Sequence, residues 1–145
     1  MVQGADNTKL IDVYFKQVRC VLELAAPAWT AGLNKRQVAQ IERVQKTMCS
    51  VLLGAEYKGY ENAFAVLDLQ PLSERRVELS LTFARKVKRS HKYSKWFIPS
   101  KCDIDRANTR SDKIALKPVK TRTMRYRKSP LPFLTKLLND NWKTT

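Results

Sequence analysis

The stretch from Leu33 to Gly54 alternates apolar and polar positions with the period of an amphipathic helix. Asn34 is a favourable N-cap, Gln37 stands where a capping box places Glu or Gln, and Gly54 supplies a stop. At about 100° per residue the apolar side chains form one stripe, typical of a helix packed on a core. The stripe consists of Val38, Ile41, Val44, Met48, Val51 and Leu52.

Three further stretches predict helices by the same pattern. The first runs from a cap at Asn7 or Thr8 to about Ala26, because Pro27 disfavours helical backbone in the residue before it. Its buried side is expected to carry Leu10, Tyr14, Val18, Val21, Leu22 and Ala25. A shorter helix fits "GYENAFAVLDL", with Tyr60, Phe64 and Leu67 spaced for burial. The last runs from a cap at Ser73 to about Ser90, with apolar residues at Val77, Leu79, Phe83, Ala84 and Val87. The chain is therefore expected to be all-α, a small bundle of three to four helices.

Charged positions within these helices are of two kinds. The outer face of the first helix offers two ion pairs at i,i+4 spacing: Asp12 with Lys16, and Arg19 with Glu23. Arg76 instead falls inside the apolar sector of the last helix. We favour the interpretation that its stem packs while its head reaches the edge. The alternative is a partly buried Arg paired with an acid such as Glu56 or Glu61.

Composition adds a strong charge imbalance. The 145 residues include 28 Lys and Arg against 13 acids, a formal charge of +15. Solubility asks for about 2 to 8 units in a small domain, so this excess indicates a polyanionic partner, most often nucleic acid. The charge is concentrated after residue 90, where 14 basic residues face 4 acidic ones. We therefore divide the chain into a helical bundle, 1–90, and a basic strap, 91–145.

The strap begins with aromatic residues among lysines and ends in an apolar segment. Tyr93 and Trp96 could stack on bases, but we favour anchoring to the bundle, because "WFIP" is a compact apolar patch. From 101 to 127 the chain is polar and basic, and is expected to be extended in part. "SPLPFLTKLLNDNW" predicts a short amphipathic helix that docks through Phe133, Leu134, Leu137 and Leu138.

Several functional classes find little support. No stretch approaches the ~20 apolar residues of a membrane span, and "MVQGADNTK" contains no signal core. An odd set of three cysteines and a single histidine argue for reduced thiols, against zinc, and for an intracellular protein, nuclear or cytoplasmic. Four glycines form no phosphate loop, and the close carboxylates Asp103 and Asp105 lie in a weakly structured stretch. We expect no cofactor, no metal and no catalytic residues.

The face of the 34–54 helix opposite its apolar stripe is basic. Lys35, Arg36, Arg43 and Lys46 cluster there, with only the small Ala39 and Ser50 between them. Such a face is often merely solvated, but it could equally accept a phosphate backbone. The charge excess favours the second interpretation. The remaining candidate contacts follow along the last helix and into the strap: Arg75, Arg85, Lys86, Lys88, Arg89, Lys92 and Lys95.

Many positions, taken in order, resemble a known family. They lie in "VYFKQVRCVLELAAPAWTAGLNKRQVAQIERVQKTMCSVLLG", "YENAFAVLDLQPLSERRVELSLTFARK" and "RYRKSPLPFLTKLLN". These segments, which cover nearly the whole chain, resemble the C-terminal region of reverse transcriptases from non-LTR retrotransposons of the jockey-like kind. The positions that carry the resemblance are Tyr14, Arg19, Leu22, Glu23, Ala26, Pro27, Trp29, Gln40, Ile41, Glu42, Val44, Gln45, Lys46, Gly54, Tyr60, Leu67, Leu72, Arg75, Arg76, Leu79 and Phe83. Cys20 and Leu24 depart from it, because the family often has Pro and an aromatic residue there.

The resemblance implies a thumb-like region beyond the palm, which grips template–primer duplex through phosphates. It implies that the polymerase aspartates lie upstream, so this chain would be a non-catalytic fragment with the palm domain as a further partner. Together with the charge, it favours a nucleic-acid-binding chain of weak sequence preference, for duplex DNA, RNA or hybrid, with no membrane partner. The alternative is a helical protein-interaction module whose strap binds an acidic protein.

Overall fold

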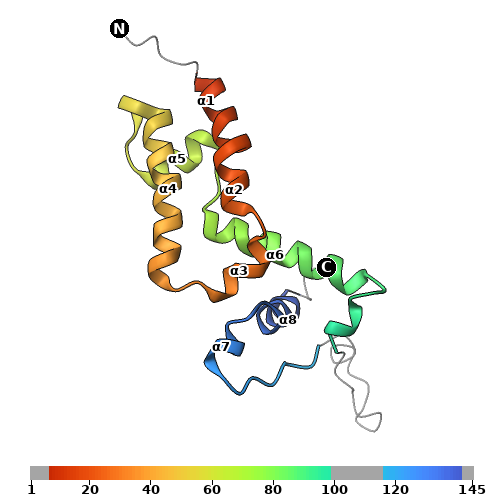
Figure 1. Ribbon diagram of the computed structural model, residues 1–145. Helices are drawn as coiled ribbons and strands as arrows, with labels where there is room; N and C mark the ends of the chain where they lie inside the picture. Colours follow the sequence, from red (N-terminus) through yellow and green to blue (C-terminus); the bar gives the residue numbers. More distant parts are fainter. Residues whose placement is uncertain (1–6, 99–115, 142–145) are drawn as a thin grey trace. The chain divides into compact units, whose positions relative to one another are not determined.

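The computed structural model describes residues 7–98 and 116–141, and within these residues it is all-α, without strands. The chain divides into two compact units (Figure 1). The first comprises residues 1–26 and 33–76, and the second 27–32 and 77–145. The predicted fold class is confirmed, with more helices than the three or four expected, because the first predicted helix is interrupted and two short helices were not foreseen.

The first predicted helix is three segments: α1 (Asn7–Val13), a π-helical segment (Tyr14–Arg19) and α2 (Cys20–Glu23). Its inward positions repeat every four residues, at 10, 14, 18 and 22 and at 11, 15, 19 and 23. In a regular α-helix, each set of four residues turns about 40° beyond a full circle, so side chains spaced by four would drift around the helix axis. The wider π turns compensate for this drift. Val21 and Leu24, which fall outside the repeat, are 69% and 72% exposed, so the prediction that Val21 is buried was wrong.

Pro27 does not end this helix. The chain leaves the helical conformation at Leu24 (ψ 123°) and Ala25 (φ 50°), before the proline is reached. Pro27 is instead the second residue of α3 (Ala26–Trp29), a position in the first helical turn where proline is tolerated. A single 3-10 turn, Thr30–Gly32, then leads toward α4.

Helix α4 (Lys35–Leu53) has the predicted ends. Asn34 accepts the Gln37 backbone N–H at 2.8 Å, the Gln37 side chain accepts the Asn34 N–H at 2.9 Å, and Gly54 is the C-cap with φ 51°. The buried stripe is rotated from the predicted one, because Gln45, Cys49 and Leu52 are buried while Val44 and Val51 are 39% and 57% exposed. Polar residues thus occupy inward positions that an apolar pattern could not reveal.

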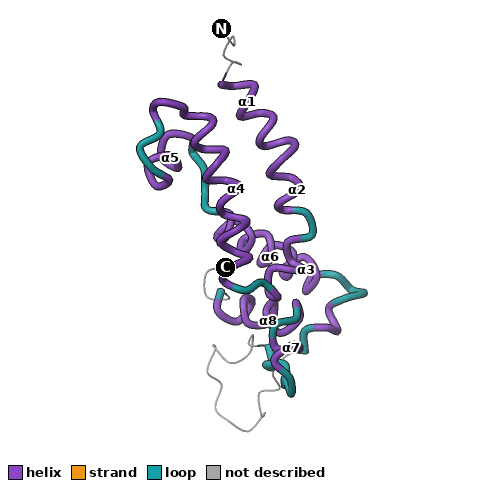
Figure 2. Tube along the Cα trace, turned by 60° about the vertical axis from the view of Figure 1, so that its left-hand side comes forward, coloured by secondary structure: helices purple, strands orange, loops and turns teal. Residues whose placement is uncertain are grey.

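Helix α5 (Tyr60–Leu67) was also predicted, and it packs beside α4 in the core of the first unit (Figure 2). Tyr14 of the π-helical segment, Cys49, Ala63 and Leu69 are the buried centre of this core. Tyr60, Phe64 and Leu67 cover it as partly buried side chains, as expected from their spacing.

Helix α6 (Leu72–Arg89) begins one residue before its predicted cap, so Ser73 lies within the helix. Its backbone N–H is bonded instead by a side chain from α4, since Glu42 Oε1 accepts it at 2.6 Å. The first four N–H groups of a helix lack partners within the helix. The carboxylate of Glu42, 31 residues earlier in the chain, therefore accepts a hydrogen bond from the first turn of α6, where the sequence predicted capping by the Ser73 side chain.

Arg76 is buried, with 1% exposure, and its Nη2 lies 3.9 Å from Glu42 Oε1. The favoured interpretation, in which the Arg76 guanidinium reaches the edge of the helix packing, was therefore wrong. The alternative, a buried Arg76 near an acidic side chain, was right about the burial and the kind of partner. The acid is Glu42, not Glu56 or Glu61, which are exposed. Burial lowers the pKa of Arg76, and the Glu42 carboxylate opposes that shift.

The core of the second unit joins α6 to the C-terminal part of the chain. Ala84 and Val87 of α6 pack with Phe97, Leu116, Leu134 and Leu138, all of them buried. The last two belong to α8 (Pro130–Asp140), so the predicted docking helix is confirmed, with Phe133 and Leu137 partly buried against the same cluster. A short α7 (Met124–Arg127) precedes it.

The chain between the two parts of this core is fixed at Leu116. Its backbone N–H donates to Asn139 Oδ1, and Asn139 Nδ2 donates to its carbonyl, both at 2.9 Å. The backbone N–H of Lys117 donates to Ile98 O at 2.8 Å. The expected boundary at residue 90 follows composition, whereas the second compact unit takes in the chain from Val77 onward together with residues 27–32. Cys102, Asp103 and Asp105 lie outside the described residues.

Candidate nucleic-acid interface

The four cations predicted on α4 occupy one exposed face. Lys35, Arg36, Arg43 and Lys46 are all exposed, and none forms an ion pair with a carboxylate in the described part of the chain. Ala39 and Ser50, which lie between them by helical period, are exposed as well. We call these four cations with Ala39 and Ser50 the α4 basic face. Its small residues allow a neighbouring surface to come close to the charges.

Two of these cations stand at the unfavourable end of the helix. Lys35 and Arg36 are the first residues of α4, whose first turn has no acid. The helix macrodipole favours negative charge at that end, and each cation there typically costs a few tenths of a kcal/mol. The positive end of the helix dipole and the two cations together produce a positive potential, which an anion such as phosphate would relieve.

A polar network on the inward side holds α4 in place. Glu42 Oε2 accepts the Tyr60 hydroxyl at 2.8 Å, and Gln45 Nε2 donates to Gln70 O at 2.9 Å. Burial and the bond to Glu42 raise the pKa of Tyr60, so its hydroxyl stays a donor at neutral pH. On the edge of the basic face, Lys46 Nζ lies 4.9 Å from the Tyr60 ring centroid, which restrains its long side chain.

A second group of predicted cations lies near the end of α6. Arg85, Lys86 and Arg89 line a shallow hollow of about 330 Å³ together with Thr82. Lys86, Lys88 and Arg89 fall in the last helical turn, where the macrodipole favours positive charge. Their effect on helix stability is therefore one reason for cations at the end of α6. It is no reason for Lys35 and Arg36, which lie at the start of α4 where positive charge is unfavourable.

Arg75 does not join either group. Its Nε lies 3.5 Å from Glu23 Oε1, the same oxygen that accepts Arg19 Nε at 2.7 Å. The ion pairs predicted between Asp12 and Lys16 and between Arg19 and Glu23 are both confirmed. The second is part-buried, whereas the sequence placed it on an outer face.

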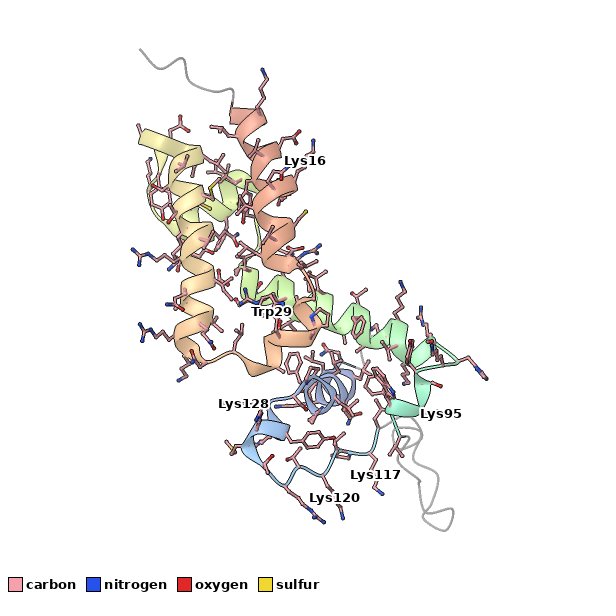
Figure 3. All side chains as sticks on the ribbon, viewed as in Figure 1. Lys16, Trp29, Lys95, Lys117, Lys120 and Lys128 are labelled. Carbon is pink, nitrogen blue, oxygen red and sulfur yellow. The ribbon has the colours of Figure 1, made fainter. Side chains whose placement is uncertain are left out.

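The turn after α6 presents the two aromatic rings considered for anchoring. Trp96 is 54% exposed and Tyr93 39% exposed, while the buried anchor is Phe97, at 4%. The expectation that Tyr93 and Trp96 anchor the strap was therefore wrong. Lys92 and Lys95 adjoin these rings in sequence. Lys95, which is labelled in Figure 3, also lines a hollow with Lys88.

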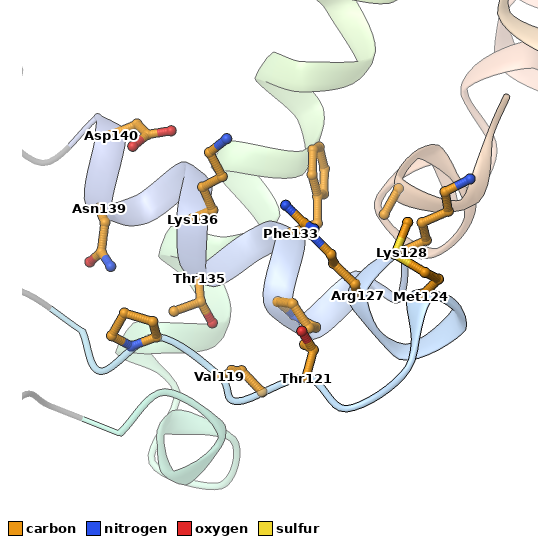
Figure 4. A pocket seen from close by; sticks show the side chains of 13 residues that line it. Val119, Thr121, Met124, Arg127, Lys128, Phe133, Thr135, Lys136, Asn139 and Asp140 are labelled. Atoms are coloured by element: carbon orange, nitrogen blue, oxygen red, sulfur yellow. The ribbon is translucent and has the colours of Figure 1, made fainter. Parts of the chain in front are cut away.

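The prediction missed a group of cations after residue 116. Exposed Lys117, Lys120 and Lys128 are labelled in Figure 3. The segment also carries Arg122, Arg125 and Arg127, all exposed. It borders a hollow of about 550 Å³ against α8, into whose lining Arg127, Lys128 and Lys136 bring positive charge and Asp140 negative charge (Figure 4). The signal was present in the composition of the strap, but no periodic pattern singled out individual side chains.

Other kinds of site find no support in the part of the chain that is described. No three His, Cys, Asp or Glu side chains lie close enough there to hold a metal ion. None of the described helices has the length and apolar character needed to cross a membrane. Comparison with family models, curated proteins and solved structures finds no match to this chain.

Proposed function

We propose that this chain binds nucleic acid through the phosphate backbone, with little choice of sequence. The observation that carries the proposal is the α4 basic face, where four exposed cations surround two small side chains. A solvated face serves solubility equally well with acids interspersed. Between Lys35 and Lys46, however, the only acid is Glu42, which is turned inward onto Tyr60 and Ser73. Positive charge unrelieved by neighbouring carboxylates is what phosphate contacts require.

The charge of the second unit supports the same proposal. Its described residues include thirteen Lys and Arg but only two acids, Glu78 and Asp140. The first unit is closer to balance, with ten basic and seven acidic residues described. Backbone binding needs several cations at once, because each neutralised phosphate releases condensed counterions. We therefore assign α4 and the second unit to the same ligand class.

We further propose that the chain is a non-catalytic, thumb-like region related to non-LTR retrotransposon reverse transcriptases. The resemblance given above supports this proposal, and the all-α fold with a cation-bearing helix is compatible with it. On this proposal, pure protein gives no primer extension with any primer–template in Mg²⁺ or Mn²⁺. Reproducible extension would overturn the non-catalytic part.

The test is a salt titration of binding to mixed-sequence duplex DNA. Changing Lys35, Arg36, Arg43 and Lys46 to Gln should reduce the slope of log K against log salt by roughly 3 to 4 units, if four phosphates are contacted there. Lys9→Gln with Lys58→Gln is the control, since these two exposed cations lie outside the proposed surface. Thermal melting should be nearly unchanged in both variants.

The outcomes distinguish the proposal from its alternatives. An unchanged slope in the fourfold variant means that the α4 basic face is only solvated. If the wild-type protein binds neither duplex nor single-stranded nucleic acid but binds an acidic polypeptide such as polyglutamate, the chain is a protein-interaction module instead. A strong dependence on base sequence would contradict phosphate contacts as the main source of affinity.

A further inference from the structure

We propose that the turn 90–97 is a stacking site for unpaired bases, so that the chain prefers strands with accessible bases at this point. The inference rests on the proposed function and deepens it, because it names single-stranded nucleic acid as the ligand of one defined surface. We use the name aromatic turn for Tyr93 and Trp96 with Lys92 and Lys95, together with Lys88 from the last turn of α6.

The two rings of the aromatic turn are exposed and mutually ordered. Their centroids lie 5.1 Å apart with planes inclined at 56°. Trp96 exposes 54% of its surface and Tyr93 39%. Each ring therefore supports the other while leaving area free for a further planar group. Aromatic side chains that accept stacked bases in single-strand-binding proteins need this free face.

The backbone beneath the rings is fixed. Within the turn, Ser94 N donates to Ser90 O at 2.9 Å, and Trp96 N donates to Tyr93 O at 3.0 Å. Phe97 N donates to Ser94 O at 3.0 Å, and its ring is buried beside Ala84 and Val87. Rings held on a rigid support lose less conformational entropy on binding than rings on a free tail. The exposed pair is thus prearranged for a ligand.

Lysines adjoin the rings in sequence and supply positive charge for the phosphates of a bound strand. Lys92 Nζ lies 5.3 Å from the Tyr93 ring centroid. Lys88 and Lys95 line a hollow of about 530 Å³ with Phe97, Ile98 and other side chains. Cations along a groove with aromatic platforms beside them are the combination that binds single strands without sequence preference. The charge and the aromatic area of this turn match both parts of such a ligand.

An anionic membrane surface also attracts aromatic residues and lysines. Surface-bound segments are usually amphipathic helices with a broad apolar face. Here Ser94–Trp96 is a single 3-10 turn, and lysines border both rings. The exposed apolar side chains here, Trp96 and Ile98, belong to no amphipathic helix and form no broad apolar face, so the observations favour bases over lipid.

The experiment compares three ligands of equal length, measured by fluorescence anisotropy. They are oligothymidylate of about 16 nucleotides, an abasic strand with the same phosphates, and a duplex. Wild-type protein should bind oligothymidylate about fivefold to a hundredfold more tightly than the abasic strand, the range expected for stacking one base. Tyr93→Ala with Trp96→Ala should abolish this difference and leave duplex affinity within about twofold.

Two further variants sharpen the assignment. Trp96→Phe should keep most of the preference for oligothymidylate, because a ring remains, but should lose the quenching of Trp96 fluorescence that base stacking is expected to cause in the wild-type protein. Met124→Ala is the matched control, since Met124 is an exposed, non-aromatic apolar residue of the same unit. It should leave all three affinities unchanged.

The results separate this inference from the function on which it rests. Equal wild-type affinity for oligothymidylate and abasic strand, with duplex binding intact, overturns the stacking site and leaves phosphate binding standing. The double variant is also tested on phosphatidylserine vesicles. If it loses binding to the vesicles but keeps the preference for oligothymidylate, the aromatic turn binds lipid and the stacking site is overturned. If wild-type protein binds no nucleic acid, both proposals fail together.

Discussion

Asn139 completes both backbone hydrogen bonds of Leu116, one accepted and one donated, each at 2.9 Å. A carboxamide carries an acceptor and a donor side by side without a charge, which is the arrangement these two bonds require. The contact fastens the chain after residue 116 to α8. It thereby positions Leu116 in the core of the second unit.

Asn139→Ala should therefore destabilise the second unit. The change leaves two backbone groups of a buried residue without these partners, at a cost of about 2 kcal/mol of unfolding free energy. Thermal or urea unfolding followed by circular dichroism measures it. Asn62→Ala, at an exposed position of α5, is the matched control and should change stability much less. Equal loss in the two variants would show that the Asn139 bonds contribute nothing specific.

A second prediction concerns Glu42, which connects α4, α5 and α6 in the first unit. Its carboxylate accepts from Tyr60 and from Ser73 N and lies near Arg76. Glu42→Gln removes the negative charge beside a buried guanidinium and should lower the unfolding free energy by about 2 to 3 kcal/mol. Glu61→Gln, an exposed position, should change stability by less than about 0.5 kcal/mol in the same denaturant titration.

Tyr14 gives a third prediction, through the dependence of stability on pH. Burial raises its pKa to about 12, which Arg19 opposes, whereas the pKa in the unfolded chain is about 10. Between these values the native state holds the proton more tightly than the unfolded state. Stability is therefore fully present below about pH 10 and falls by up to about 3 kcal/mol as the pH rises to about 12.

Tyr14→Phe should make this decline shallower. At pH 7 it should be neutral or stabilising, because the Tyr14 hydroxyl is buried without a hydrogen-bond partner among the described residues. Urea titrations at several pH values test both statements, with exposed Tyr126→Phe as the control. A clear loss of stability at pH 7 would mean that the hydroxyl makes a bond after all.

The end of α6 gives the fourth prediction. Changing Lys86, Lys88 and Arg89 to Gln should reduce the salt slope for duplex binding by about 2 to 3 units. It should also lower helix stability slightly, by a few tenths of a kcal/mol per charge removed from the last turn. A changed melting temperature with an unchanged slope would indicate that these cations serve the helix alone.

Local chemistry made part of the fold predictable. The ends of α4 follow from Asn34, Gln37 and Gly54, which act within one turn of the chain. The buried face of α5 and the docking of α8 follow from apolar spacing alone. The caps and the apolar faces of these helices depend on residues near one another in sequence, so a local pattern could reveal them, whereas the partners of α8 in the core come from distant parts of the chain.

Other features depend on distant partners and could not be predicted. Ser73 was predicted as the N-cap, but the Glu42 carboxylate, 31 residues away in sequence, bonds a backbone N–H at the start of α6 instead. Gln45 is a polar residue that an apolar pattern does not mark as buried, and its burial depends on the Gln70 carbonyl, which accepts from its Nε2. Arg76 fell inside the apolar sector, but its full burial depends on the Glu42 carboxylate, which comes from another helix. Among the candidate contacts, the periodic cations of α4 were found and those of 117–128 were not, because residues 117–123 form no helix and α7, at four residues, is too short to show a period.

The π-helical segment Tyr14–Arg19 has a consequence for length changes in the first helix. A π turn is geometrically equivalent to one residue inserted into an α-helix. Removing a single residue there, for example Gln17, would allow regular α-helix from end to end. The downstream residues would then keep their orientation relative to the upstream ones, because the π turn accommodates its extra residue locally. Alignments of related chains should therefore show one-residue gaps at this segment, and a gap of one there would preserve helicity and keep the same side of Cys20–Glu23 toward the core.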